Sequence, residues 1–179
     1  RPPFLKRGDT IGLTATARFL ETEKIDEARA IIHQFGFKTK VSPYASIPFH
    51  QFGGSDENRA TDLQGLLHDP EVKAIFGVRG GYGTVRILDL IDWSILEKQP
   101  KWLCGYSDLT ALHGRCSCLG IESLHCTMPV NFSGNEKKAL DLTFDTLQGT
   151  LPHQSWHGNN FDIEGKAEGI IKGGNLSVL

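Results

Sequence analysis

Short apolar runs alternate with stretches of helical periodicity over most of this chain of 179 residues. Five runs have the length and residue types of strands, at residues 10–16, 37–41, 73–78, 102–104 and 121–124. Strands that alternate with helices pair in parallel, because each helix returns the chain to the same edge of the sheet. The sequence therefore predicts an α/β fold, in which a parallel sheet has helices on both faces.

The stretches between these runs predict helices over residues 22–35, 55–68, 85–91, 109–119 and 135–147. Thr22 is the expected N-cap of the first helix, and Ser55 or Asp56 that of the second, since their side-chain oxygens can accept from free backbone N–H groups. Gly36 is expected to end the first helix. Residues 43–54, rich in Pro, Gly and aromatic residues, are expected to form a loop.

The character of the sequence changes after Gly149. Short β-like runs are broken there by Pro, His, Gly and Asn residues, and the chain stops inside an apolar segment. We therefore expect an α/β domain over residues 1–149, followed over residues 150–179 by a linker and the start of a smaller, β-containing domain. Because a folded domain rarely ends in an apolar segment, we also expect this chain to be a fragment.

Composition excludes several classes of protein. Hydrophobic residues make up 39% and charged residues 22%, a globular balance rather than a disordered one. The net charge is -2 without any run of Lys or Arg, so we expect neither a nucleic acid nor a membrane as partner. No apolar run approaches the ~20 residues that a membrane span needs. We expect a cytoplasmic protein, although the sequence begins at Arg1 and the removal of a leader stays open.

The four cysteines do not form a C-x-x-C pair. Cys116 and Cys118 make a C-x-C motif with His113 and His125 nearby, a combination that a zinc ion could use. The commoner explanation is that the cysteines are reduced thiols, mostly buried, in an intracellular protein. We expect neither a metal ion nor another cofactor.

The segment Gly105-Tyr106-Ser107-Asp108 lies between a predicted strand and a predicted helix. A serine at such a turn projects its hydroxyl above the carboxyl edge of a parallel sheet, where ligands of these folds bind. The pattern is part of the G-x-S-x-G motif of hydrolases with a nucleophilic serine, with Leu109 in place of the second glycine. Taken alone, the segment is explained equally well by Ser107 or Asp108 capping the helix.

A second segment, Arg79-Gly80-Gly81-Tyr82-Gly83, also follows a predicted strand and precedes a predicted helix. Glycines there let the backbone approach a ligand and leave its N–H groups accessible. The loop could form an oxyanion hole together with the N–H of Asp108, cradle a phosphate, or be a tight turn. Its glycine spacing matches neither of the common nucleotide-binding motifs. Arg79 could bind a substrate carboxylate or form a structural ion pair.

Together the two loops resemble those of the LD-carboxypeptidases, cytoplasmic serine peptidases that trim murein peptides and include relatives that cleave a peptide-nucleotide antibiotic. Segments that carry the resemblance lie at residues 2–11, 56–63, 77–83, 100–113 and 173–176, so it covers almost the whole chain. One stretch departs from the family, which often has His-Gly-Pro-Met where this chain has His125-Cys126-Thr127-Met128.

The resemblance implies that Ser107 is the catalytic nucleophile. It implies further site residues: the backbone N–H groups of Gly81 and Asp108 as the oxyanion hole, and Arg79, Gly80 and Tyr82 at the border of the substrate pocket. The catalytic Glu and His of the family lie in a second domain, beyond the segment that residues 173–176 resemble. We therefore expect the chain taken alone to lack the base that a serine nucleophile needs.

Two histidines could in principle replace that base, namely His113, on the helix after Ser107, and His125, at the end of the next predicted strand. A buried or hydrogen-bonded structural role is the commoner one for such residues, and we expect it for both.

The function that follows from the resemblance is hydrolysis of the amide bond between an L-centre and a terminal D-amino acid in murein tetrapeptides, a step of cell-wall recycling. The partner would be a small peptide substrate, and a homodimer stays open. The alternative is a non-catalytic α/β ligand-binding module, in which the Gly80-Gly81 loop and the Ser107 turn hold an anionic ligand through backbone amides.

Overall fold

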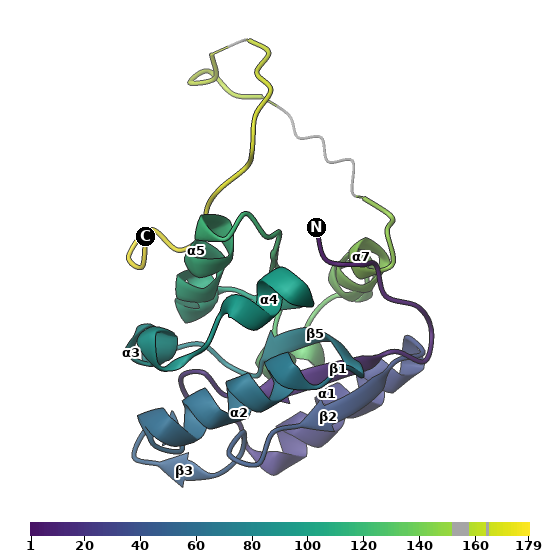
Figure 1. Cartoon of the computed structure of the whole chain (residues 1–179). Helices are drawn as coiled ribbons and strands as arrows, with labels where there is room; N and C mark the ends of the chain where they lie inside the picture. Colours follow the sequence, from purple (N-terminus) through teal and green to yellow (C-terminus); the bar gives the residue numbers. More distant parts are fainter. Residues whose placement is uncertain (152–157, 164) are drawn as a thin grey trace.

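The computed structural model describes residues 1–151, 158–163 and 165–179. Its centre is a parallel sheet of five strands in the order β2-β1-β5-β6-β7 (Figure 1). These strands are β1 (Thr10–Thr14), β2 (Lys38–Val41), β5 (Val72–Gly77), β6 (Trp102–Gly105) and β7 (Leu124–His125). The prediction of a parallel sheet is confirmed.

Helices cover both faces of this sheet, as predicted (Figure 1). One face carries α1 (Thr22–Gln34), α6 (Pro129–Phe132) and α7 (Lys137–Leu147), and the other carries α2 (Asp56–His68), α3 (Thr84–Ile87), α4 (Ser94–Lys98) and α5 (Thr110–Cys118). Successive strand residues point to opposite faces, so the central strands β5 and β6 supply both cores. On β6, Trp102 and Cys104 pack with α1 and α7, whereas Leu103 packs with α2 and α5.

Local signals explain where the first two helices begin and end. Ser55 caps α2, because its Oγ accepts from Asn58 N at 3.2 Å in a capping box. Gly36 follows α1 in the left-handed conformation, with φ 88°. The prediction for Thr22 is wrong: Glu21 holds the cap position without a side-chain hydrogen bond, and its carbonyl accepts from Ile25 N at 3.1 Å. Thr22 is therefore the first helical residue.

Several short elements differ from the sequence prediction. Strands β3 (Pro48–Phe49) and β4 (Phe52–Gly53) form a hairpin inside the expected loop, which turns at His50 with φ 55°. Helices α4 and α6, of five and four residues, were not expected. The expected helix over residues 85–91 is divided into α3 and a 3-10 helix, η1 (Leu88–Leu90). Elements of this length contain too little periodicity to be recognised in a sequence.

Strand β7 begins later than the predicted strand over residues 121–124. Ile121 N donates to Cys116 O at 2.9 Å, so this backbone closes the end of α5 instead of pairing with β6. Pairing with β6 starts only at Leu124, opposite Cys104.

Beyond Gly149 the described residues contain no strand, so the β-like runs expected after this point form none over residues 158–163 and 165–179. Apolar side chains such as Phe161 and Ile171 are exposed. The domain boundary near residues 149–152 stays a prediction. Three of the residues expected to interrupt the β-like runs, Pro152, His153 and His157, lie outside the described residues. None of the described helices has the length and apolar content of a membrane span.

Candidate functional site

Two loops meet at the carboxyl edge of the sheet. Strands β5 and β6 are neighbours, with Phe76 opposite Cys104, and the glycine loop and the serine turn follow their ends. A Cβ atom built on Gly80 would lie 3.1 Å from Ser107 Oγ and 3.5 Å from Asp108 N. The backbone of the glycine loop is therefore in direct contact with the serine turn, and a side chain at Gly80 would crowd the hydroxyl.

Ser107 has a backbone conformation that residues with a side chain rarely adopt. Its φ is 60°, in the left-handed region. Such a conformation costs on the order of 1–3 kcal/mol and persists where the surrounding structure enforces it, commonly at functional sites. Strand β6 ends at Gly105, and the 3-10 helix η2 (Ser107–Leu109) begins two residues later, so the chain turns sharply at this serine.

Neither Ser107 nor Asp108 caps the helix that follows, because η2 and α5 both begin without a side-chain hydrogen bond. The buried Asp108 side chain instead accepts from Thr84 N, at the start of α3, with Oδ2 2.8 Å away. Thr84 Oγ1 in turn lies 2.9 Å from Thr16 Oγ1. The capping explanation is therefore wrong, and the Asp108 side chain connects the serine turn to the end of the glycine loop.

Leu109 occupies space that two glycines leave open. Cβ atoms built on Gly77 of β5 and on Gly105 of β6 would each lie 2.4 Å from Leu109 Cδ2. The leucine that replaces the second glycine of the hydrolase motif is buried, at 1% exposure. Gly77, on the neighbouring strand, thus provides the room that this departure from the motif requires.

A cavity of about 290 Å³ opens beside Ser107. Its lining consists of Arg18, Arg79, Gly80, Gly81, Tyr106, Ser107, Met128, Val130 and Asn131. The structure thus brings together four of the predicted site residues, Ser107, Arg79, Gly80 and Gly81. Asp108 lies behind the serine turn, and Tyr82 lies outside the lining with its side chain 52% exposed.

Sequence reasoning missed several lining residues. Arg18 follows β1 and so lies at the same carboxyl edge, a signal that the strand prediction already contained. Met128, Val130 and Asn131 come from the start of α6, which the sequence pattern does not mark. Tyr106 Oη donates to Asn131 Oδ1 at 2.7 Å, so α6 is connected to the residue before Ser107.

His113 is held by hydrogen bonds at both ring nitrogens. Nε2 lies 2.9 Å from Gly105 O, and Nδ1 lies 2.8 Å from Ser123 Oγ. Because a carbonyl oxygen only accepts, Nε2 carries the proton and Nδ1 accepts from the serine hydroxyl. Burial lowers the pKa of this imidazole, so it stays neutral. The structural role expected for His113 is confirmed, and no ring nitrogen is free to take a proton from Ser107.

The structural role expected for His125 is not confirmed, because this side chain is exposed; its ring lies near those of Tyr106 and His113, with centroids 6.5 and 5.7 Å apart. The cysteines are free thiols, with Cys104 and Cys116 buried and Cys118 exposed. Burial raises the pKa of the Cys116 thiol to about 12. Within the described parts of the chain, no group of three or more His, Cys, Asp or Glu side chains could hold a metal ion.

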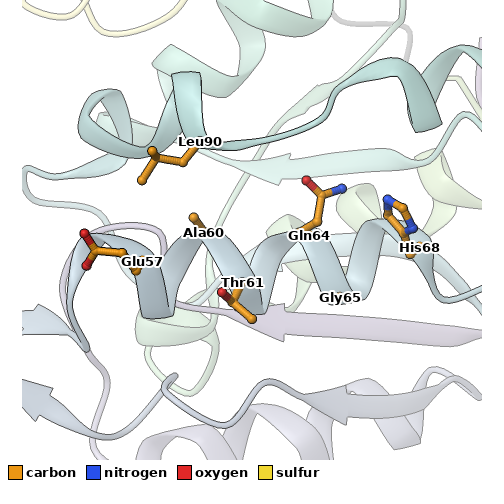
Figure 2. Close-up of a pocket in the computed structure, with 7 residues that line it drawn as sticks. All are labelled: Glu57, Ala60, Thr61, Gln64, Gly65, His68 and Leu90. Atoms are coloured by element: carbon orange, nitrogen blue, oxygen red, sulfur yellow. The ribbon is translucent and has the colours of Figure 1, made fainter.

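A larger hollow of about 460 Å³ runs along α2 (Figure 2). Its lining consists of Glu57, Ala60, Thr61, Gln64, Gly65, His68 and Leu90, and Figure 2 shows Leu90 opposite the helix. It shares no residue with the cavity beside Ser107. Because it contains neither the glycine loop nor the strained serine, we place the candidate site at the smaller cavity.

The sequence matches the N-terminal domain of the LD-carboxypeptidases over residues 11–126. The chain belongs to this family. The match extends from β1 to just beyond β7 and includes both loops of the candidate site.

Relatives in the family are longer than this chain. The probable murein peptide carboxypeptidase of Bacillus subtilis is 32% identical over all of this chain, which spans 58% of that protein. The murein tetrapeptide carboxypeptidase of Pseudomonas aeruginosa is 22% identical over 94% of this chain and 58% of its own length. The crystal structure of an MccF-like protein from Bacillus anthracis is similar with a TM-score of 0.75 at 29% identity, covering 82% of this chain and 46% of that one.

Proposed function

We propose that this chain is the nucleophile-bearing part of a serine carboxypeptidase, which hydrolyses an L,D amide bond in murein tetrapeptides and releases the terminal D-amino acid. The observation that carries this proposal is the left-handed Ser107, with φ 60°, in contact with Gly80. Relatives named as murein peptide carboxypeptidases support the class of substrate. The reaction would serve the recycling of cell-wall peptides in the cytoplasm.

The proposed chemistry begins when Ser107 Oγ attacks the carbonyl carbon of the scissile amide and a base takes the hydroxyl proton. The resulting oxyanion accepts hydrogen bonds from the N–H groups of Gly81 and Asp108. Collapse breaks the C–N bond, the leaving amine takes the proton, and the D-amino acid departs. Water then attacks the Ser107 ester, a proton returns to Ser107 Oγ, and the shortened peptide leaves as an acid.

The other predicted residues support this nucleophile. The Asp108 side chain, which accepts a hydrogen bond from Thr84 N, holds the serine turn against the end of the glycine loop. Arg79 and Gly80 line the space in which the peptide would lie, and Tyr82 would meet it from the exposed side. The base remains to be supplied, because both nitrogens of His113 are engaged and His125 does not line the cavity beside Ser107. We expect a Glu and a His from the part of the family that this chain does not span.

An anion-binding module is the weaker explanation of the same loops. Backbone N–H groups alone suffice to hold an anion. Such a module would give no reason for Ser107 to keep a conformation that costs on the order of 1–3 kcal/mol. A nucleophile that must project from the sheet edge does give one.

The test measures the release of D-amino acid from a murein tetrapeptide by the full-length protein. We expect hydrolysis by the wild type, a loss in kcat of about 10³-fold or more in Ser107→Ala, and no hydrolysis of a control peptide that ends in the L-amino acid. Residues 1–179 alone should be inactive, because the general base that would activate Ser107 is expected from the part of the family that this chain does not span. Hydrolysis by Ser107→Ala at the wild-type rate would show that another residue is the nucleophile.

A further inference from the structure

Arg18 lies at the same sheet edge as Ser107 but takes no part in the chemistry described above. The β3–β4 hairpin holds it in place: Arg18 forms a β-bridge with Phe52, and its Nη2 donates to Gln51 Oε1 at 3.1 Å. Gly53 N also donates to Ala17 O at 3.1 Å. The Arg18 side chain thus extends from a fixed backbone, with most of its guanidinium N–H groups still available to a ligand.

The Arg18 side chain passes across the glycine loop. A Cβ atom built on Gly81 would lie 2.9 Å from Arg18 Cγ and Cδ and 3.1 Å from Nε. Because Gly81 also has a φ of 122°, a side chain there would be strained as well as obstructed. The absence of a side chain at Gly81 therefore lets Arg18 line the cavity that contains Ser107.

This cavity has positive charge without a compensating carboxylate. Arg18 and Arg79 are the charged residues of its lining, and neither forms an ion pair within the described ranges of the chain. Guanidinium groups bind carboxylates through parallel N–H···O bonds. Two such groups beside a nucleophile therefore favour an anionic ligand, and a substrate cleaved at its last amide bond has a carboxylate next to that bond.

The glycine loop lies next to both the nucleophile and Arg18. Gly80 is in contact with Ser107, and the next residue, Gly81, is in contact with the Arg18 side chain. In the substrate, the scissile carbonyl and the terminal carboxylate belong to neighbouring residues, so a peptide bound along this loop could present the first to Ser107 and the second to Arg18.

We propose that Arg18 binds the free α-carboxylate of the leaving D-amino acid and so restricts cleavage to the last amide bond of the peptide. This role deepens the proposed function and rests on it. Arg18 is then a specificity-determining residue that the hairpin positions, and the Gln51 hydrogen bond sets the direction of its guanidinium.

The test uses the full-length protein and two peptides, a murein tetrapeptide with a free terminal carboxylate and the same peptide with a C-terminal amide. The measured quantity is the ratio of kcat/KM for the acid to that for the amide. Because both values come from one preparation, the ratio does not depend on the fraction of enzyme that is folded. The variants are Arg18→Gln, Arg18→Lys and, as a control with the same charge change on α1, Arg29→Gln.

We expect the wild type and Arg29→Gln to prefer the acid equally. Arg18→Gln should lower the ratio by about 10- to 100-fold, and Arg18→Lys should lower it less, because a charged hydrogen bond is lost in the first and kept in part in the second. Equal losses on both peptides, or an unchanged ratio with Ser107-dependent hydrolysis intact, would overturn the role of Arg18 and leave the proposed function standing. If the wild type hydrolysed neither peptide, the proposed function would fail, and the role of Arg18 with it.

Discussion

The contact between the glycine loop and the serine turn can be tested by adding a single methyl group at Gly80. Gly80→Ala would place a Cβ 3.1 Å from Ser107 Oγ, where the scissile carbonyl must approach. We expect kcat/KM for the tetrapeptide to fall about 10²-fold, because displacing the reacting groups by about 1 Å has an effect of this size on catalysis.

The control for this prediction is Gly114→Ala in α5, where a Cβ meets nothing within 4 Å. Gly114→Ala should keep its activity and raise the free energy of unfolding by about 0.5–1 kcal/mol, because alanine favours the helix interior. Equal activities of the two variants, measured on folded protein, would contradict the proposed site.

Single residues also show what the sequence could and could not predict. Ser107 and Gly80 follow strands that the apolar pattern marks, so their meeting at one edge follows from strand order. Arg18 follows a marked strand too, but its role depends on the β3–β4 hairpin and on the missing side chain at Gly81. Residue type favoured Thr22 as the cap of α1, but the first helical hydrogen bond, from Ile25 N, is accepted by Glu21 O, so the start of this helix required the backbone.

Among the elements, the buried Arg59 of α2 connects three segments around the site. Its Nε donates to Thr16 O at 3.1 Å and its Nη1 to Gly54 O at 2.9 Å, and it pairs with Asp56. Arg86 after the glycine loop pairs with the same Asp56 at 2.7 Å. Hydrogen bonds from Arg86 and, to a smaller extent, from Arg59 lower the pKa of the Asp56 carboxyl.

Arg59→Met should therefore lower the free energy of unfolding by about 3–5 kcal/mol, because it leaves two buried carbonyls without a donor. Arg86→Met removes an exposed partner of the same carboxylate and should lower the free energy of unfolding several-fold less than Arg59→Met does. Chemical denaturation of both variants measures the difference. A similar loss in the two would mean that burial of Arg59 contributes little.

His113 connects α5 to β6 and to the segment before β7, and it does so as the neutral imidazole. Since burial lowers its folded pKa, the unfolded chain binds the proton more readily. The stability that His113 contributes is complete above the unfolded pKa of about 6.5 and declines as the pH falls toward the folded pKa.

His113→Gln removes this titration. The difference in unfolding free energy between wild type and His113→Gln should therefore shrink as the pH is lowered from about 7.5 to about 5. Denaturant titrations at several pH values measure it, and the other histidines cancel in the comparison. A difference that stays constant over this range would contradict the neutral, buried His113.

For the whole molecule, the alternation of strands and helices was sufficient to predict the parallel sheet and its two helical layers. It could not predict the hairpin at residues 48–53 or the turn of α6, because elements of two to four residues depend on their tertiary partners. The hairpin pairs with Arg18, which lines the cavity, and α6 contributes Asn131 to the lining. The proposed nucleophile could thus be predicted from the sequence, whereas the walls of the cavity beside it required the fold.

The measurement that tests the central claim most directly is the labelling of the full-length protein with a serine-reactive phosphonate, followed by mass spectrometry of its peptides. A nucleophilic Ser107 should take up one phosphonyl group on the peptide that contains it, and Ser107→Ala should take up none. Labelling of Ser107→Ala to the wild-type extent, or an adduct on a different residue alone, would contradict the assignment.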